Sequence, residues 1–277
     1  MKVLLFGGRG YIGGWFRQIF PDAVLSSVDT ADACGVAESL DREKPDIVIN
    51  TAAKTGRPNI DWCEDHKQET IHSNVRGPLV LLEECAKCNV YWVHLSSGCI
   101  YQGDNNGKGF SEEDPPNFFG SFYSQTKAWA DQILKEFPVL ILRLRMPFDD
   151  TLHERNLISK LLEYRRVLDV KNSLTYLPDF IDIAHSLIKK RRTGVFNIVN
   201  PGSISPYEIM NMYKKFVQKN HIFERLTLAQ LSEVAKAGRS NCVLSTEKLQ
   251  KAGIILPDVC QRLEEVMRKL SITTARP

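Results

Sequence analysis

A glycine-rich turn between a short apolar strand and an amphipathic helix constrains the fold of this chain more than any other feature. Val3–Phe6 is wholly apolar, and Gly7, Gly10 and Gly13 follow it at a Gly-x-x-Gly-x-x-Gly spacing. Apolar residues then recur at helical spacing over residues 12–20. A wholly apolar strand is typical of a parallel sheet that is covered on both faces. The turn therefore predicts a β–α unit whose helix N-terminus can hold the pyrophosphate of a dinucleotide.

The first half of the chain continues this alternation of short apolar strands and helices. Strands are expected at residues 23–25, 46–49, 90–95 and 139–144, with helices at 36–43, around 79–86 and at 121–136. Repeated alternation implies right-handed crossovers. We therefore predict an α/β fold with a doubly wound parallel sheet.

The pattern changes after Pro147, which suggests two parts. Residues 1–148 form the predicted dinucleotide-binding core, to which a strand at about 194–199 returns, and 149–277 form a smaller, mainly helical substrate lobe. A helix is expected to begin at Ser205, because Pro206 and Glu208 follow it in a capping arrangement. Residues 103–120 are rich in Gly, Asn, Asp and Pro and are expected to form a long loop, a candidate lid.

Composition excludes several classes of protein. Of the 277 residues, 43% are hydrophobic and 25% are charged, which is typical of a globular protein. A net charge of +3 is too small to indicate binding to nucleic acid or to a membrane. No stretch approaches the ~20 apolar residues of a membrane span. Seven cysteines without a secretory signal are typical of reduced thiols, so a cytoplasmic location is expected.

Three residues form a candidate catalytic group. Tyr123 and Lys127 are four apart in a predicted helix and so share one face, where the ammonium could lower the phenol's pKa from its usual ~10. Ser97 ends the strand at 90–95, at the sheet edge where ligands of α/β proteins bind. A hydroxyl there can stabilise negative charge on a carbonyl oxygen. With a hydride donor at the glycine turn, this group predicts carbonyl reduction.

The cofactor prediction leans towards NADPH. Arg9 lies within the turn, where a guanidinium can bind a 2′-phosphate. Asp29 could instead contact a ribose hydroxyl or the adenine, which leaves NADH open, and a solvated surface arginine is the alternative for Arg9. The residues assigned to the dinucleotide are Gly7, Arg9, Gly10, Tyr11, Ile12, Gly13, Asp29, Ala52, Ala53, Lys54, Tyr123 and Lys127.

The chain resembles an extended short-chain dehydrogenase/reductase, because the glycines come first, Ser97 follows, and Tyr123-x-x-x-Lys127 comes last. This resemblance implies a Rossmann fold. Asn74 also resembles the asparagine of that superfamily. Longer strings resemble the nucleotide-sugar epimerase/reductase of plants and giant viruses: residues 55–64, Gly98-Cys-Ile100, Pro116-Asn-Phe118, Gly120-Ser-Phe-Tyr-Ser124, Arg145-Met-Pro147 and Arg239-Ser-Asn241.

This narrower resemblance implies two reactions at one site. The family makes NDP-L-rhamnose from NDP-4-keto-6-deoxy-D-glucose by 3,5-epimerisation followed by 4-reduction. The matching epimerase positions are Cys99 and Lys160, a base and an acid for protons next to a ketone. The implied substrate-binding residues are Thr55, Arg57, Asn59, Asp61, Asn74, Arg239 and Asn241, with Arg239 and Asn241 on the diphosphate.

Alternatives remain for several of these residues. Ser97 stands where plant members tend to have Thr, which is an equivalent hydroxyl. Cys99 could be a buried packing thiol, in which case the protein is a 4-reductase alone, and a regulatory subunit without activity is a further alternative. Cys63-x-x-His66 and Cys85-x-x-Cys88 have zinc-like spacing, but their context argues against a site, so no metal is predicted. The expected partner is a UDP- or dTDP-sugar, and extended reductases often form homodimers.

Overall fold

The computed structural model describes residues 1–274 and contains a six-stranded parallel sheet. Its strand order is β2 (Val24–Ser26), β1 (Val3–Phe6), β3 (Ile47–Asn50), β4 (Tyr91–Ser97), β5 (Leu140–Leu144) and β9 (Gly194–Asn197). All five pairings are parallel. The chain winds outward in both directions from β1 and β3, so the sheet is doubly wound as predicted. Ligands in such sheets bind where the winding direction changes, beside the carboxyl ends of these two strands.

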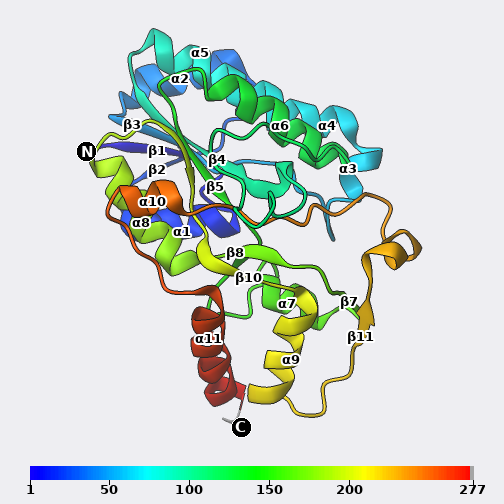
Figure 1. Ribbon diagram of the computed structural model, residues 1–277. Helices are drawn as coiled ribbons and strands as arrows, with labels where there is room; N and C mark the ends of the chain where they lie inside the picture. Colours follow the sequence, from blue (N-terminus) through cyan, green and yellow to red (C-terminus); the bar gives the residue numbers. More distant parts are fainter. Residues whose placement is uncertain (275–277) are drawn as a thin grey trace.

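Helices cover both faces of this sheet (Figure 1). α1 (Tyr11–Ile19) and α8 (Leu177–Lys189) pack on one face, and α2 (Ala33–Glu43), α5 (Gly77–Lys87) and α6 (Phe122–Leu134) lie on the other. Successive β1 residues alternate between the two apolar cores: Leu5 packs with α1 and α8, whereas Leu4 packs with α2 and α5. Burial on both faces explains why these strands are wholly apolar.

The predicted strands and helices of the core agree with the structure to within a few residues. β1 coincides with the prediction, and the return strand is β9, paired with β5. α2 begins earlier than predicted because the Asp32 side chain accepts a hydrogen bond from the Gly35 N–H and caps the helix. α9 (Pro206–Phe216) begins after Ser205 with the predicted capping box to Glu208.

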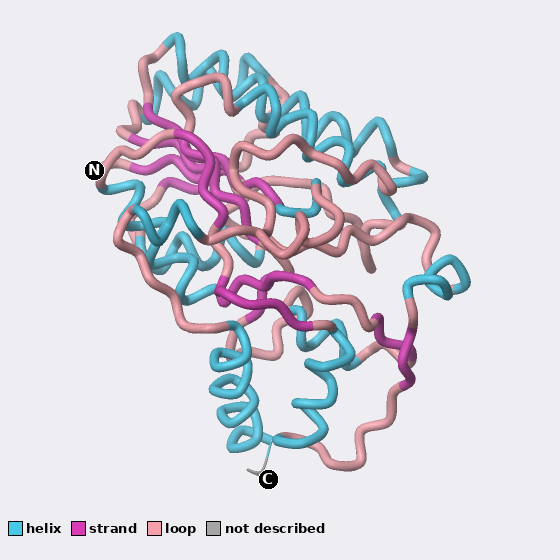
Figure 2. The backbone as a smooth tube through the Cα atoms, in the orientation of Figure 1, coloured by secondary structure: helices cyan, strands magenta, loops and turns pink. Residues whose placement is uncertain are grey.

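Residues beyond β5 build a second group of elements below the sheet (Figure 2). Helices α7 (Leu157–Leu162), α9 and α11 (Val259–Thr274) pack around a sheet of β10 (Asn200–Ile204), β8 (Asn172–Tyr176) and β6 (Pro147–Phe148). A parallel pair, β7 (Arg166–Leu168) and β11 (Glu224–Leu226), lies at its edge. These strands were not predicted from the sequence. Each is too short to show a clear alternation of apolar and polar residues.

The chain crosses between the two parts more often than the expected division at residue 148 implies. α8 lies within the predicted lobe range, but its apolar face, including Phe180 and Ala184, packs on the large sheet beside α1. α10 (Glu247–Lys251) also places Leu249 in that core. Within residues 149–274, the lobe is therefore made of the elements other than α8, β9 and α10.

The loop at 103–120 contains no regular helix or strand, as predicted, but it is held firmly to the core. Gly103 and Phe110 form isolated bridges with Cys242 and Leu244. The Glu112 carboxylate accepts a hydrogen bond from the Asn197 N–H at 2.9 Å and is 5% exposed. These contacts contradict the expectation that the loop is a lid, because a lid has to detach from the core.

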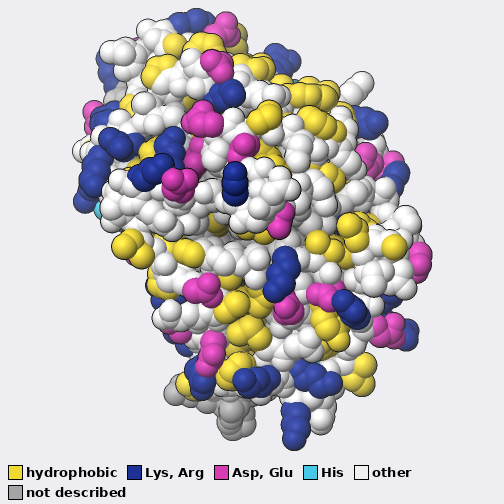
Figure 3. All heavy atoms as spheres, viewed as in Figure 1, with side chains coloured by type: hydrophobic (Ala, Val, Ile, Leu, Met, Phe, Trp, Pro, Cys, Tyr) yellow, Lys and Arg dark blue, Asp and Glu magenta, His cyan; other side chains and the backbone are white. Residues whose placement is uncertain are grey.

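The surface carries both signs of charge. Acidic side chains lie among the basic ones over most of the face shown in Figure 3. Within residues 1–274, no helix is long and apolar enough to cross a membrane.

Candidate active site

The glycine turn has the shape that close backbone packing requires. Gly7 has φ +75°, and a Cβ atom there would lie 2.5 Å from the Ala52 nitrogen at the end of β3. The Gly10 N–H donates to the Gly7 carbonyl at 2.9 Å, and Gly10 precedes α1 without any side-chain cap. The first N–H groups of α1 therefore have no side-chain acceptor and can bind an anion.

Gly13 and Gly14 provide a matched test of this turn. A Cβ on Gly13 would lie 2.3 Å from the Gly7 carbonyl oxygen, whereas a Cβ on Gly14 meets no atom within 4 Å. We expect Gly13→Ala to reduce the free energy of unfolding by about 1–3 kcal/mol and to weaken dinucleotide binding. Gly14→Ala should be neutral or stabilising by up to ~1 kcal/mol, because Ala favours helix. Urea denaturation and a fluorescence titration with NADPH check both; equal behaviour of the two variants would contradict the assignment.

A groove of about 360 Å³ is lined by Asp29, Lys54, Gln68, Glu69 and His72. Asp29 is not free in it: its carboxylate accepts from the Ala31 N–H at 2.9 Å and pairs with His72 at 3.1 Å. Burial opposes ionisation of Asp29, but these two contacts hold its pKa below the usual value. Arg9 is exposed and makes no hydrogen bond or ion pair with any residue in 1–274.

The catalytic group predicted from the sequence comes together at the carboxyl end of β4. Ser97 ends that strand, and its hydroxyl accepts a hydrogen bond from the Cys99 N–H at 3.2 Å. Tyr123 lies in the first turn of α6 and is partly buried, and the Ser97 side chain is close enough to lower the pKa of its phenol. Lys127, one turn later, is 2% exposed, and its Nζ donates to the Leu95 carbonyl at 3.1 Å.

The electrostatics of Tyr123 differ from the expectation. Burial raises the pKa of Tyr123 well above its usual value, and the neighbouring Cys99 thiol acts in the same direction. The groups that lower it are Ser97 and the Arg145 guanidinium rather than Lys127. Burial also lowers the pKa of Lys127. The phenol therefore holds its proton firmly at neutral pH in this structure.

Cys99 lies in the short 3₁₀ turn Gly98–Ile100 that follows β4, and it is 6% exposed. Its thiol is close enough to raise the pKa values of both Tyr123 and Lys127. A second buried thiol, Cys242, donates to the Gly98 carbonyl at 3.0 Å in the same apolar cluster. Cys99 therefore lies near the two residues of the predicted reductase, whereas the Cys242 thiol is engaged by the Gly98 carbonyl.

Lys160 lies on α7, in the second part of the molecule. Burial and the neighbouring Arg155 lower the pKa of its ammonium, and the side chain makes no hydrogen bond or ion pair with the residues described in 1–274. Arg155 reaches across to the loop after β3, where its Nη1 donates to Thr55 Oγ1 at 3.3 Å and to the Gly56 carbonyl at 3.1 Å. Lys160 is thus a partly buried amine near Arg155, the residue that contacts that loop.

The loop at 55–61 is tied to residues that the sequence analysis assigned to the diphosphate. Arg239 donates both terminal nitrogens to the Asp61 carboxylate, at 2.8 and 3.0 Å, and its Nη2 reaches Asn59 Oδ1 at 3.4 Å. Burial opposes ionisation of Asp61, yet the hydrogen bonds from Arg239 and the Ala237 N–H keep its pKa low. Arg239 is thus paired with Asp61 in this structure, and its place on the diphosphate stays a prediction. Arg57 is exposed and pairs only with exposed Glu154 at 3.3 Å.

Two predicted substrate-binding amides are used within the protein. Asn74 is 1% exposed; its amide oxygen accepts from the Lys54 N–H at 2.8 Å and its amide nitrogen donates to the Lys54 carbonyl at 2.9 Å. The same nitrogen reaches Thr126 Oγ1 on α6 at 3.3 Å. Asn241 is 3% exposed and bonds to Asn172 and to the Arg239 carbonyl. Both amides hold loops at the site rather than pointing free groups into it.

Sequence reasoning did not assign a role to Arg145, although it quoted the residue within Arg145-Met-Pro147. Arg145 is 8% exposed, donates to Asn172 Oδ1 at 2.6 Å and lowers the pKa of Tyr123. Its buried Nε has no partner among the described residues. Met146, which follows it, has φ +41°, a backbone conformation that costs energy for a side chain of this kind. Arg145 directly follows β5, at the carboxyl edge of the sheet where ligands bind. That position was the signal from which a role for Arg145 could have been predicted.

A buried ion pair anchors α6, the helix that carries Tyr123 and Lys127, to the sheet. The Asp131 carboxylate accepts from Arg143 Nε at 3.0 Å and Nη2 at 2.5 Å, and both side chains are 1% exposed. Ser96 Oγ donates to the same carboxylate at 2.7 Å. Asp131 also raises the pKa of Lys127, one turn away.

Removing one partner of this pair should be costly. We expect Asp131→Ala to reduce the free energy of unfolding by about 3–5 kcal/mol, because the Arg143 charge then stays buried and uncompensated. Urea denaturation measures the loss. The matched control is Glu247→Ala, which breaks the exposed pair with Lys251 at 2.7 Å and should cost no more than ~1 kcal/mol. Similar losses in the two variants would show that the buried pair is not the main anchor.

Comparison with known proteins places this geometry among sugar-nucleotide enzymes. The family model described as the RmlD substrate binding domain matches residues 1–272. A bifunctional dTDP-4-dehydrorhamnose 3,5-epimerase/dTDP-4-dehydrorhamnose reductase of Arabidopsis thaliana is 38% identical over 260 residues, covering 90% of this chain and 86% of the plant protein.

Solved structures agree with that match. The L780 UDP-rhamnose synthase from Acanthamoeba polyphaga mimivirus superposes with a TM-score of 0.92 at 34% identity, covering 97% of this chain and 99% of the viral one. A dTDP-4-dehydrorhamnose reductase from Bacillus anthracis, solved in complex with NADP, superposes with a TM-score of 0.82 at 19% identity over 98% and 99% of the chains. At that identity the bacterial structure supports the fold alone.

Proposed function

Because the chain belongs to the RmlD substrate-binding-domain family, we propose that it converts NDP-4-keto-6-deoxy-D-glucose to NDP-L-rhamnose as a 3,5-epimerase and NADPH-dependent 4-reductase. The similarity to a bifunctional epimerase/reductase over most of both chains supports both activities. The observation that carries the proposal is the gathering of Ser97, Cys99, Tyr123 and Lys127 at the carboxyl end of β4.

The glycine turn fits a nicotinamide dinucleotide. Gly7 and Gly13 leave room for close backbone approach, and the uncapped first turn of α1 suits a pyrophosphate. When bound, the cofactor supplies a hydride to C4 of the sugar. We propose NADPH rather than NADH because the Arg9 guanidinium is exposed and unpaired among the described residues, whereas Asp29 is engaged by His72. Ala52, Ala53 and Lys54 lie after β3 at the same edge and complete the proposed site.

Reduction requires a proton as well as a hydride. The Tyr123 hydroxyl donates its proton to the C4 oxygen as the carbonyl becomes an alcohol. Burial keeps that proton in place until the oxygen becomes basic enough to take it. The Ser97 hydroxyl holds the same oxygen while negative charge develops on it, and Lys127 stabilises the phenolate that remains.

Epimerisation requires proton transfer on both faces of the sugar. The Cys99 thiolate removes a proton from C3 or C5, each of which is next to the C4 ketone. The Lys160 ammonium returns a proton from the opposite face, and its lowered pKa suits it to give up that proton. Each centre is inverted when the proton leaves one face and another arrives on the other, so no net redox change occurs.

The proposal also assigns the two parts of the chain and the substrate-binding residues predicted from the sequence. Residues 1–148 with β9 bind the dinucleotide, and the 149–277 lobe together with the loop at 55–61 binds the nucleotide sugar. Thr55, Arg57, Asn59 and Asp61 lie on the sugar side. Arg239 reaches the diphosphate by exchanging part of its Asp61 contact, while Asn74 and Asn241 position the loops. A cytoplasmic homodimer remains a prediction that sedimentation and fractionation would test.

Product analysis by NMR tests the proposal directly. The protein is incubated with UDP- and dTDP-linked 4-keto-6-deoxyglucose in parallel, each with NADPH or NADH. The expected product is the L-rhamnose nucleotide, formed faster with NADPH. A 4-reduced sugar that keeps the original configuration at C3 and C5 would show a reductase alone. Absence of turnover with all four combinations would overturn the proposed function.

A further inference from the structure

A hydrogen bond joins the glycine turn to the lobe. Tyr11 is the first residue of α1, directly after Gly10, and its hydroxyl donates to Asp149 Oδ2 at 2.6 Å. Asp149 follows β6 and is 1% exposed. Burial, together with this hydrogen bond, raises the pKa of Tyr11, so the phenol keeps the proton that it shares with Asp149. The contact spans two parts of the molecule that are far apart in the chain.

The second oxygen of the same carboxylate organises the start of α7. Asp149 Oδ1 accepts from the Thr151 N–H and hydroxyl, both at 2.7 Å, and from Asn156 Nδ2 at 2.8 Å. Asn156 in turn caps α7, because its Oδ1 accepts from the Ile158 N–H at 3.0 Å. The Lys160 N–H donates to the Asn156 carbonyl at 3.1 Å. One carboxylate therefore links Tyr11 to the helical turn that carries Lys160.

A ring contact supports the same connection. The Tyr11 ring stacks on His153, with centroids 4.6 Å apart and planes 12° apart. His153 Nδ1 accepts from the Arg155 N–H at 3.0 Å, and Arg155 binds Thr55 and Gly56 in the loop after β3. The segment at 149–156 is thus held against α1 at one side and against the substrate loop at the other.

We propose that Tyr11 and Asp149 are positioning residues for the epimerase step, which hold α7, and with it Lys160, in place relative to the glycine turn. The inference rests on the proposed function, since that assigns the proton donor to Lys160. A sugar that stays bound through both reactions has to lie within reach of the hydride donor at the glycine turn and of the Lys160 ammonium on the lobe. The Tyr11–Asp149 bond provides a direct mechanical link between those two places.

The test is Tyr11→Phe, which removes one hydroxyl and keeps the ring that stacks on His153. Deuterium incorporation from D2O at C3 and C5 of the 4-keto sugar nucleotide is followed by NMR without any dinucleotide, so cofactor binding does not enter the measurement. We expect kcat for exchange to fall about 10- to 100-fold, as small displacements of a catalytic group do, with KM unchanged. A merely stabilising hydroxyl would lower the melting temperature without this selective effect on kcat.

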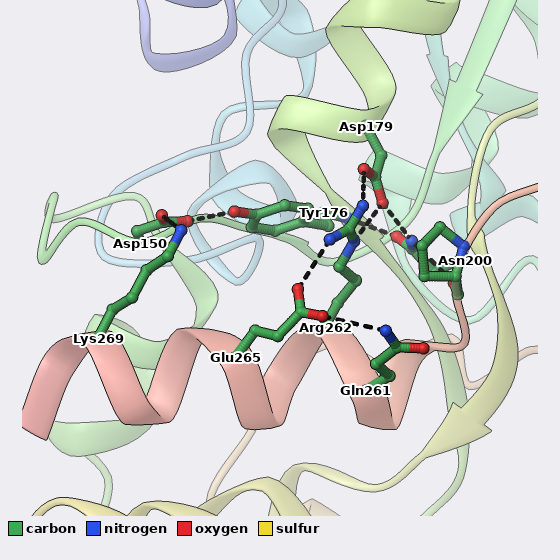
Figure 4. A network of polar contacts seen from close by, with 9 residues as sticks. Asp150, Tyr176, Asp179, Asn200, Gln261, Arg262, Glu265 and Lys269 are labelled. Carbon is green, nitrogen blue, oxygen red and sulfur yellow. Dashed lines mark hydrogen bonds and ion pairs between the residues drawn. The ribbon is translucent and has the colours of Figure 1, made fainter.

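Tyr176→Phe is the matched control. The Tyr176 hydroxyl donates to Asp150 Oδ1 at 2.5 Å. This is the same type of tyrosine–carboxylate bond as that of Tyr11, and its acceptor is the residue directly after Asp149. That bond leads to α11, where Lys269 pairs with Asp150 and Arg262 pairs with Asp179 (Figure 4). Exchange in Tyr176→Phe should stay within about twofold of wild type, because this bond does not lead to the cap of α7.

The outcomes separate the inference from the function on which it rests. Unchanged exchange in Tyr11→Phe, or an equal loss in both variants, overturns the positioning role alone. If the wild-type protein incorporates no deuterium from D2O into either nucleotide sugar, the proposed epimerase function is overturned, and this inference with it.

Discussion

Replacing Tyr123 with Phe is expected to slow 4-reduction about 10²- to 10⁴-fold, the usual contribution of a positioned proton donor. The variant keeps the aromatic ring in its apolar cluster and loses only the hydroxyl near Ser97. The hydride then adds to a carbonyl whose oxygen has no proton donor beside it. Oxidation of NADPH, followed at 340 nm with the 4-keto sugar nucleotide, measures the loss.

A second tyrosine in the same cluster controls for general disturbance. The Tyr101 hydroxyl donates to the Asp114 carbonyl at 2.7 Å, away from Ser97. Tyr101→Phe should lower the free energy of unfolding by about 1–3 kcal/mol and leave reduction largely intact in the folded fraction. If Tyr123→Phe reduces the sugar at the wild-type rate, the assignment of the proton donor to Tyr123 is wrong.

Replacing Cys99 with Ser should slow epimerisation by a similar factor of about 10² to 10⁴. A serine hydroxyl occupies the same place after β4, but an alcohol is far less acidic than a thiol, so it cannot act as the base. Hydride transfer to a keto sugar that is already epimerised should continue, because Ser97, Tyr123 and Lys127 are unchanged. The variant therefore separates the two proposed activities.

Deuterium incorporation at C3 and C5 and the yield of the rhamnose nucleotide are measured together. Cys242→Ser is the control, because this second thiol lies in the same cluster and bonds to the Gly98 carbonyl. We expect it to affect stability more than exchange. Rhamnose formation at the wild-type rate in Cys99→Ser would show that Cys99 is not the epimerase base.

Local patterns were sufficient for the core of the fold and for the reductase group. Apolar strands alternating with helices predicted the parallel sheet, and the spacing of Tyr123 and Lys127 placed both on one face of α6. These predictions hold because they depend on neighbours within one or two turns of chain. The roles of Cys99 and Lys160, in contrast, came from resemblance, since an isolated thiol or amine carries no pattern.

Charge partners were predicted less well. Arg239 was expected to be available for a diphosphate, but it pairs with Asp61, which lies far away in the sequence. Tyr123 was expected to be acidified by Lys127, but burial dominates and raises its pKa. A pKa depends on desolvation and on every nearby charge, and neither can be read from spacing along one helix.

By itself the sequence determined the kind of sheet and where on it the candidate residues lie, because strand burial, helix periodicity and glycine turns are local properties. Only the tertiary structure decided how the two parts of the site are joined. The bonds of Asp149 to Tyr11 and to Asn156, and those of Asn74 to Lys54 and Thr126, connect segments that meet only after folding. Such contacts form between groups whose distance in space is set by the packing of whole layers, and no local pattern encodes that distance.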